Sequence, residues 1–291
     1  MRQAGHKPGQ KGGETIRAVF RYPGSKWSIA EWVVSHFPAG YEKMVYLEPF
    51  VGSGAVFFNK RPSAVETIND IDSNIVNLFR VLRDQPDELR RVLQLTPYSR
   101  EEYDLSFAPC EDPVEKARRY MVRTTQAIGA KMYGSQKCGW RNHKQMKIGG
   151  TACKWGGIVE TIDAAAARLR GDTTHLVQIE HTDALELIQR YSHQDVLMYL
   201  DPPYVLDTRQ GKLYSHEMTN AEQQLLLDII TTSKAKIVIS GYESDLYNTA
   251  LKGWSKDSAK SQTTSGKMAT ETIWMNYAPP IEQISIFTER R

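Results

Sequence analysis

The sequence predicts an α/β fold in which a mostly parallel sheet is covered by helices on both faces. Short apolar segments typical of buried strands alternate with segments whose apolar residues repeat at helical spacing. Glycines and acidic residues stand directly after several of the expected strands, where open α/β sheets bind their ligands. The alternation is interrupted once, which predicts an insertion over about residues 96–171.

The alternation before the insertion consists of two strand–helix pairs. Strands are expected at residues 45–47 and 65–69. A turn with two glycines follows the first strand and opens a helix that includes Phe57 and Phe58. Asp72 can cap the helix after the second strand, because its carboxylate can accept the unpaired amide hydrogens of a helix start.

The same alternation resumes after the insertion. Thr219 and Glu222 form the pattern of a capping box, in which side chains and backbone amides satisfy one another at a helix start. The elements expected here are a strand at 176–179, a helix at about 184–191, a strand at 196–200, the capped helix through residue 230, and strands at 237–239, 272–277 and 283–287.

The composition is that of a soluble globular protein with a substantial core. Of the 291 residues, 41% are hydrophobic and 24% are charged, and no run reaches the ~20 apolar residues that span a bilayer. Residues 1–15 have no apolar run, so a disordered tail is expected there and not a signal peptide. The catalytic domain is then expected to comprise residues 16–95 and 172–291.

The number and spacing of the cysteines indicate the cellular compartment of the protein. Cys110, Cys138 and Cys153 form no paired framework, which fits a reducing environment and predicts a cytoplasmic protein. Cys138 and Cys153 flank His143, but a zinc site needs four ligands at tighter spacing, so no metal site is expected. One chain carries every motif described below, and no obligatory protein partner is expected.

The charge is distributed unevenly along the chain. Residues 115–170 contain twelve Lys or Arg and three Asp or Glu, which gives this segment a net charge of +9. The whole chain carries +3, so the remainder carries −6. A basic segment on an otherwise acidic protein indicates a polyanionic partner such as nucleic acid. The alternative is a solvated basic helix face.

A glycine turn at residues 48–54, Glu-Pro-Phe-Val-Gly-Ser-Gly, joins a strand to a helix. Its glycines allow a tight bend and a close approach of a ligand to the backbone. The third glycine of the dinucleotide-binding fingerprint is missing, because residue 57 is Phe. Asp70 ends the next strand, where an acid commonly binds ribose hydroxyls. The alternatives are a plain turn and a helix cap, although Asp72 is the better capping residue.

The string Asp201-Pro202-Pro203-Tyr204 follows the apolar strand at residues 196–200. Two prolines stiffen the loop and leave their carbonyls as acceptors. Asp201 adds a carboxylate, and Tyr204 adds an aromatic face. The loop is therefore suited to a flat ring that bears an amine. The alternative is a rigid turn with an exposed tyrosine.

These motifs resemble, in their order, those of the Dam-like adenine DNA methyltransferases of phages and restriction-modification systems. The resemblance extends from about residue 18 to residue 287. It implies a Rossmann-like fold dependent on S-adenosylmethionine, with residues 96–171 as a mostly helical and loop target-recognition insertion. It is carried by Phe-Arg-Tyr-Pro-Gly-Ser-Lys at 20–26, the turn at 48–54, Ile-Asn-Asp-Ile-Asp at 68–72, Asp-Pro-Pro-Tyr at 201–204, Ile-Ser-Gly-Tyr at 239–242 and Glu-Thr-Ile-Trp-Met-Asn-Tyr at 271–277.

The resemblance also implies roles for single residues. Asp70 would bind the ribose of the cofactor and Asp183 its adenine. The target base would be held by the catalytic loop of Asp201, Pro202, Pro203 and Tyr204. The residues expected to bind S-adenosylmethionine are Tyr22, Lys26, Glu48, Phe50, Gly52, Gly54, Asp70, Asp183 and Asp201.

The expected reaction is methyl transfer to the N6 amine of adenine in duplex DNA. The amine is a poor nucleophile because its lone pair is delocalised into the ring. Asp201 and the Pro202 carbonyl can each accept one amine hydrogen, which favours a pyramidal and more nucleophilic nitrogen. The base must leave the helix, and Tyr204 would stack on it.

The insertion supplies basic residues for the DNA backbone. Arg141 can also read a guanine, and Tyr133, Trp140 and Trp155 can fill the gap left by the flipped base. For each tryptophan, packing within the insertion is an equal alternative. The residues expected to contact DNA are Lys131, Lys137, Arg141, Lys144 and Lys147, with Lys154 as a further basic residue of the segment.

Other functions remain open at this point. The same fold can methylate the N4 amine of cytosine, and RNA is a weaker alternative substrate. A non-catalytic DNA-binding module would have no reason to keep both Asp201 and the glycine turn. A nicotinamide-dependent enzyme would be expected to have the third glycine. No cysteine lies near a motif, which argues against methylation of a cytosine ring carbon.

Overall fold

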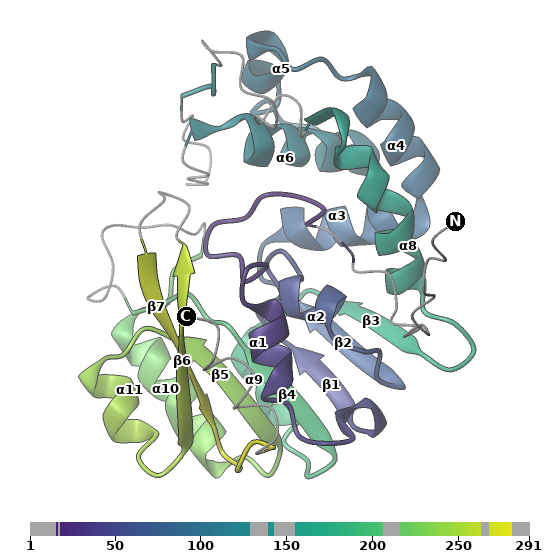
Figure 1. Cartoon of the computed structure of the whole chain (residues 1–291). Coiled ribbons are helices and arrows are strands. Elements are labelled where there is room, and N and C mark those ends of the chain that lie inside the picture. Colours follow the sequence, from purple (N-terminus) through teal and green to yellow (C-terminus); the bar gives the residue numbers. More distant parts are fainter. Residues whose placement is uncertain are drawn as a thin grey trace, which may run out of the picture.

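The fold is built on one seven-stranded sheet (Figure 1). The computed structural model describes residue 16 and residues 18–128, 139–142, 155–205, 216–262 and 268–280. The strand order is β3-β2-β1-β4-β5-β7-β6. The strands are β1 (Val45–Glu48), β2 (Val65–Asn69), β3 (Leu176–Glu180), β4 (Val196–Leu200), β5 (Lys236–Gly241), β6 (Ser255–Gln262) and β7 (Met268–Met275).

The first five strands are parallel, and β7 runs antiparallel to both β5 and β6. This confirms the predicted, mostly parallel sheet. β7 begins four residues before the expected strand at 272–277. Strand β6 was not predicted, because its sequence, Ser-Lys-Asp-Ser-Ala-Lys-Ser-Gln, has no apolar alternation and lies at the sheet edge. The strand expected at 283–287 lies outside the described residues.

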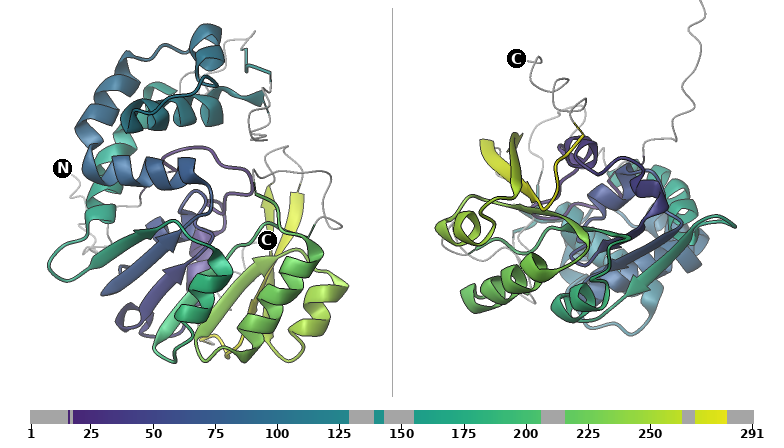
Figure 2. Two further views of the ribbon diagram at one scale, coloured as in Figure 1. Left: turned by 180° about the vertical axis from the view of Figure 1, so that it is seen from behind. Right: turned by 90° about the horizontal axis from the view of Figure 1, so that it is seen from below.

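Helices cover both faces of the sheet, as Figure 2 shows from behind and from below. In these views α1 lies on the face opposite to α9, α10 and α11. No described helix is long and apolar enough to span a membrane. The helices are α1 (Ala30–Ser35), α2 (Ala55–Asn59), α3 (Ser73–Asp84), α4 (Pro86–Leu95), α5 (Arg100–Leu105), α6 (Pro113–Gln126), α8 (Ile162–Arg170), α9 (Ala184–Arg190), α10 (Asn220–Thr232) and α11 (Asp245–Ala250), with 3-10 turns at Tyr41–Lys43 and Ile158–Thr161.

Strand alternation explains why two apolar cores form. Side chains along a strand point to opposite faces in turn. In β1, Tyr46 packs into one core and Leu47 into the other. In β5, Val238 belongs to the first core, whereas Ile237 and Ile239 belong to the second. The all-apolar strands expected from the sequence are therefore buried on both sides.

The expected helix starts are confirmed by their caps. The Asp72 carboxylate accepts a hydrogen bond from the backbone amide of Asn74 at 2.9 Å, at the start of α3. Thr219 and Glu222 form the full capping box of α10. These signals are local in sequence, so they can be read without knowledge of the fold.

The helices of the 96–171 segment are joined to the sheet by a continuous core. Tyr103 in α5, Tyr120 in α6 and Leu169 in α8 are buried in the same cluster as Phe79 in α3. In Figure 1, α5 and α6 stand beyond the end of the sheet where the carboxyl ends of the parallel strands lie, and α8 runs from there down toward β3. The segment therefore stands over the edge at which α/β sheets bind ligands.

The strand order reverses between β1 and β4. From β1 the chain passes outward to β2 and β3, and it then returns to β4 on the other side of β1. At such a reversal, the connections leave in opposite directions and open a crevice at the carboxyl ends of the strands. This position is where the candidate site is found.

Candidate active site

A cavity of about 430 Å³ lies at the carboxyl ends of β1, β2 and β4. It brings together most of the residues that the sequence analysis assigned to a cofactor. It is also lined by residues that the sequence did not indicate, including Tyr199, His216 and Met218. The predicted residues that line it are Tyr22, Lys26, Glu48, Phe50, Gly52, Asp70, Asp183, Asp201 and Pro203.

The glycine turn after β1 shapes one wall of the cavity. Gly52 has a φ of 48°, and a Cβ there would lie 2.8 Å from Cε1 of Tyr22. Only glycine lets the tyrosine ring lie against the turn in this conformation. Gly54 has a different role, because it is not among the lining residues and its missing Cβ makes room for Phe58.

Asp70 closes the turn from the end of β2. Its carboxylate accepts hydrogen bonds from the amides of Gly52 and Asp72, both at 2.9 Å. Burial raises its pKa to about 7, although these hydrogen bonds lower it in part. Each carboxylate oxygen has two lone pairs, so both can accept a further hydrogen from a ligand.

Asp183 follows β3 and stands at the start of α9. One carboxylate oxygen accepts from the amides of Leu185 and Glu186, at 2.8 and 3.1 Å. The residue is therefore the helix cap, a role that the sequence analysis did not assign. It also lines the cavity, and so its expected cofactor role stays a prediction.

Asp201 stands directly after β4 and lines the cavity. Its Oδ2 lies 3.0 Å from Nζ of Lys26. Its Oδ1 is buried and has no hydrogen-bond partner in the described part of the chain. Burial raises the pKa of Asp201 to about 6, and the Lys26 charge limits this rise.

The loop after Asp201 is held rigidly. The carbonyl of Pro203 accepts a hydrogen bond from Nε2 of Gln223 at 2.5 Å. Gln223 is fixed in turn by the hydroxyl of Tyr247, which donates to its Oε1 at 2.7 Å. The expectation that both proline carbonyls stay unused is therefore wrong for Pro203. No donor to the Pro202 carbonyl is seen among the described residues.

Tyr204 is buried, with 5% of its surface exposed. Its hydroxyl donates to Oε2 of Glu271 at 2.5 Å. The ring centroids of Tyr204 and Tyr242 lie 4.7 Å apart, and Nζ of Lys26 lies 4.8 Å from the centroid of the Tyr204 ring. The ring is not among the residues that line the cavity. Its role as a stacking platform thus stays a prediction, and the exposed tyrosine of the alternative is not observed.

Glu48 ends β1 at the floor of the cavity and is fully buried. Burial raises its pKa to about 8, and the hydroxyl of Tyr46, which donates to Oε2 at 2.6 Å, opposes this rise. Nζ of Lys60 lies 4.1 Å from the centroid of the Tyr46 ring. Glu48 therefore connects the cavity to a second group of buried charges.

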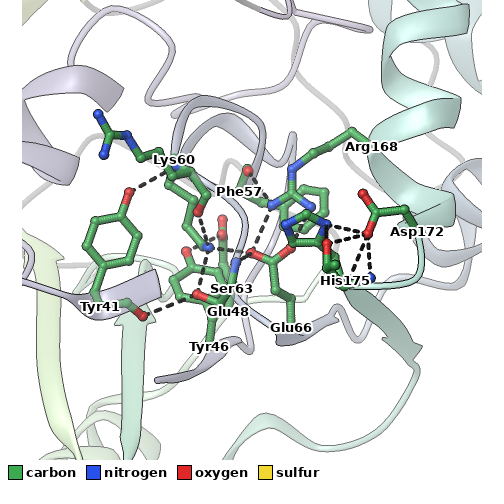
Figure 3. A network of polar contacts seen from close by, with 12 residues as sticks. Tyr41, Tyr46, Glu48, Phe57, Lys60, Ser63, Glu66, Arg168, Asp172 and His175 are labelled. Carbon is green, nitrogen blue, oxygen red and sulfur yellow. Dashed lines mark hydrogen bonds and ion pairs between the residues drawn. The ribbon is translucent and has the colours of Figure 1, made fainter. Parts of the chain in front are cut away.

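This second group is an ionic cluster of Lys60, Glu66 and Arg168 (Figure 3). Lys60 forms a hydrogen-bonded ion pair with Glu66. Arg168 in α8 reaches the same carboxylate with Nη2 at 2.8 Å, and it also donates to the carbonyl of Phe57. Burial opposes ionisation of Glu66, yet these two cations hold its pKa below the usual value. No motif or periodicity in the sequence predicts this cluster.

The predicted DNA contacts are only partly described by the structure. Arg141 donates from Nε and Nη2 to the carbonyl of Ala127, both at 3.3 Å, so its guanidinium is engaged within the chain. Lys131, Lys137, Lys144, Lys147 and Lys154 lie outside the described residues, as do Tyr133, Cys138, His143 and Cys153. Among described residues, no group of three or more His, Cys, Asp or Glu is suited to a metal.

The tryptophans of the insertion differ from one another. Trp155 is buried, and its Nε1 donates to the carbonyl of Thr96 at 2.9 Å. Trp155 therefore packs within the insertion, as the alternative predicts, and its contact with DNA stays an untested prediction. Trp140 is half-buried, and its Nε1 donates to Gln126 at 3.0 Å.

Several arginines of the basic segment are paired inside the protein. Arg118 bridges Glu102 and Glu115 at 2.7 and 2.6 Å, and Arg119 also binds Glu115. Arg168 belongs to the ionic cluster. The net charge of +9 therefore overstates what these arginines can offer a polyanion.

Comparison with known proteins identifies the family. A family model described as D12 class N6 adenine-specific DNA methyltransferase matches residues 22–265. The chain belongs to this family. The match includes strands β1 to β6 and the segment between β2 and β3, so the predicted adenine-specific DNA methyltransferase and its Rossmann-like fold are confirmed.

Individual relatives agree with this assignment. The Type II methyltransferase M1.LlaDCHI of Lactococcus lactis subsp. cremoris is 25% identical over 295 residues, which cover 92% of this chain and 98% of that protein. DNA adenine methylases of Serratia marcescens and Salmonella typhi are 33% and 32% identical over 26% and 35% of this chain. These two matches cover only 26% and 37% of the relatives.

A solved structure of the rRNA methyltransferase aviRa from Streptomyces viridochromogenes is 13% identical. It covers 94% of this chain and 92% of its own, with a TM-score of 0.38. A similarity this low supports no conclusion about this D12 class methyltransferase.

One buried carboxylate of the site, Glu271, had no role predicted from the sequence of this D12 class methyltransferase. Glu271 in β7 is 6% exposed and lies against Tyr204 and Lys26. The strand pattern contained a signal for it, since Glu271 shares a strand face with the buried residues Ile273 and Met275. A carboxylate on an apolar strand face is costly to bury without partners, and so it indicates a nearby cation or donor.

Proposed function

We propose that this methyltransferase acts on adenine flipped out of duplex DNA, that S-adenosylmethionine binds in the cavity, and that Asp201 accepts the target amine. One observation carries the proposal. Oδ1 of Asp201 is a buried carboxylate oxygen without a partner among the described residues, on a residue that lines the cavity. Leaving a buried acceptor unsatisfied costs about 1–3 kcal/mol, so such an atom is expected to receive a donor from a substrate.

The cavity suits S-adenosylmethionine in size and in donor set. Its volume of about 430 Å³ is in the range of small-molecule sites. Carboxylates of Asp70 and Asp183 provide acceptors for ribose hydroxyls and for an adenine amine. Tyr22 and Phe50 provide aromatic surface, and the Gly52 turn permits close approach. When bound, this cofactor supplies a methyl group on a positively charged sulfur.

The catalytic loop is proposed to prepare the amine. Asp201 Oδ1 and the Pro202 carbonyl each accept one amine hydrogen, which raises electron density on the nitrogen. Lys26 holds the other oxygen of Asp201 at 3.0 Å, and Gln223 holds the loop through Pro203. Positioning and aimed dipoles of this kind supply most of the rate enhancement in such transfers. Asp201 or water receives the proton that the amine loses.

The target base must reach this loop from within a duplex. Flipping costs a few kcal/mol of unstacking and unpairing, and phosphate contacts from basic side chains offset it. Lys131, Lys137, Arg141, Lys144 and Lys147 are proposed to provide such contacts, with residues 96–171 as the target-recognition part. Residues 16–95 and 172–291 then form the catalytic part. Tyr204 is proposed to stack on the base after the side chains around its ring rearrange.

The test is methyl transfer from labelled S-adenosylmethionine to genomic DNA that lacks N6-methyladenine. The DNA is then digested to nucleosides, and a mock purification controls for other methyltransferases. Label in N6-methyldeoxyadenosine is expected. Label in methylcytosine, or label only when RNA replaces DNA, would contradict the proposed substrate. Sequencing of the methylated DNA would then define the recognised site.

A further inference from the structure

Glu271 begins the expected motif at residues 271–277, but no role in the site was predicted for it. It lies on the antiparallel strand β7, next to β5, so it approaches the catalytic loop from a different strand than Asp201. Its Oε2 accepts from Tyr204 at 2.5 Å and lies 3.9 Å from Nζ of Lys26. The residue is buried, and so its charge is felt strongly by these neighbours.

Lys26 is shared between two carboxylates. Its ammonium lies 3.0 Å from Asp201 and donates to the carbonyl of Gly24 at 2.8 Å, besides its longer contact with Glu271. One ammonium and two ionised carboxylates leave the group with a net charge of −1. With Asp201 alone, the ammonium would neutralise the carboxylate that has to accept the amine.

We propose that Glu271 is a positioning residue for methyl transfer, which shares Lys26 with Asp201 and fixes the hydroxyl of Tyr204. It thereby keeps a net charge of −1 on the group of Lys26, Asp201 and Glu271 and leaves Asp201 electron-rich. This inference rests on the function proposed above. A net charge of −1 also complements the positive sulfur of S-adenosylmethionine, whereas S-adenosylhomocysteine has a neutral sulfur.

The surroundings of Glu271 support this role. The titratable groups that face it are Lys26, Asp201, Tyr199, Tyr204 and Tyr242. The charge of Glu271 contributes to the raised pKa of Asp201, after the larger effect of burial. Removing that charge should therefore lower the pKa of Asp201. A residue that only supported the strand would not change this titration.

The deciding variant is Glu271→Gln, which can still accept from Tyr204 but carries no charge. Affinity for S-adenosylmethionine and S-adenosylhomocysteine is measured by calorimetry on the full chain. We expect a loss of about tenfold or more for the first ligand and less than about threefold for the second. Equal losses, or none, would overturn the inference. A wild-type protein that binds neither ligand would overturn the proposed function as well.

Methyl transfer gives a second readout. In Glu271→Gln the single-turnover rate should fall about tenfold or more, and the acid limb of its pH profile should move to lower pH. Glu271→Asp keeps the charge and should recover part of the rate, which also guards against a folding defect of the amide variant. Tyr204→Phe removes the hydroxyl, which interacts with both Glu271 and Asp201, and should leave ligand discrimination intact. If Tyr204→Phe reproduces the loss of discrimination, the charge-sharing role is wrong.

Discussion

The cavity and the ionic cluster behind it both bury carboxylates, but they balance them in opposite ways. In the ionic cluster, one carboxylate, Glu66, faces two cations, Lys60 and Arg168. Beside the cavity, two carboxylates, Asp201 and Glu271, share one cation of the described residues, Lys26. The pKa of Glu66 is lowered, whereas burial raises the pKa of Asp201 to about 6.

The ratio of cations to carboxylates distinguishes the structural ionic cluster from the ligand-binding site. Where cations outnumber carboxylates, the charges are compensated internally and the group holds elements together, here α8 and the sheet. Where carboxylates outnumber cations, one carboxylate oxygen remains without a cation or donor. In this site that atom is Oδ1 of Asp201, a residue that lines the cavity. Clusters of the second kind are those expected to bind ligands or move protons.

The largest effect on stability is expected from Glu66→Ala. It leaves Lys60 and Arg168 buried without their common partner, which should cost about 3–5 kcal/mol in the free energy of unfolding. Denaturant unfolding measures this loss. The matched control is Glu115→Ala, since Glu115 also binds two arginines but is more exposed and should cost about 1 kcal/mol or less. Equal losses of unfolding free energy in the two variants would contradict the special structural role of the buried ionic cluster.

The next effect concerns the cavity wall. Gly52→Ala should lower affinity for S-adenosylmethionine about tenfold or more, because the new Cβ would collide with the Tyr22 ring. Gly40→Ala is the control, since Gly40 also has a positive φ, 74°, but nothing lies within 4 Å of its Cβ position. Both variants should lose about 1 kcal/mol of stability from backbone strain. Only Gly52→Ala should lose binding in calorimetry.

Glu48, which lies between the cavity and the ionic cluster, is expected to make the stability of the protein depend on pH. Its pKa is about 8 in the folded protein and close to 4.3 in an unfolded chain. A raised folded pKa means that the folded state binds the proton more tightly, so stability falls as pH rises from about 4.3 to about 8. Glu48→Gln should therefore be more stable than wild type at pH 8, by about 1 kcal/mol or more, and similar at pH 4.5. A gain that is independent of pH would contradict the assignment.

The smallest effect separates two roles of Asp183. Asparagine is also a good helix cap, so Asp183→Asn should change stability by about 0.5 kcal/mol or less, whereas Asp183→Ala should lose about 1 kcal/mol. If the carboxylate also binds the cofactor, Asp183→Asn should weaken S-adenosylmethionine binding a few-fold. Unchanged binding would leave Asp183 with its capping role alone.

Much of this molecule can be predicted from local patterns. The central strands, the caps at Asp72 and Thr219, and most of the cavity lining follow from sequence periodicity and motifs. The resemblance placed Asp201 among the expected catalytic residues, and its role as the acceptor of the target amine stays a prediction. The helix cap formed by Asp183 could also have been predicted, since an Asp before an expected helix is a capping signal.

Other features depend on contacts between distant segments. Glu66 and Arg168 are 102 residues apart, and Tyr204 and Glu271 are 67 apart. No periodicity specifies such pairs, because they exist only once the sheet order is set. The edge strand β6 was missed for a different reason, since an exposed polar strand has no apolar pattern to detect.

The most direct test of the account is the single-turnover methyl transfer rate of Asp201→Asn with saturating DNA and cofactor. The amide has the shape of the carboxylate but lacks its charge. We expect the rate to fall about 100-fold or more, with a change in unfolding free energy of about 1 kcal/mol or less. A rate within about threefold of wild type would contradict the claim that the unpartnered oxygen of Asp201 prepares the target amine.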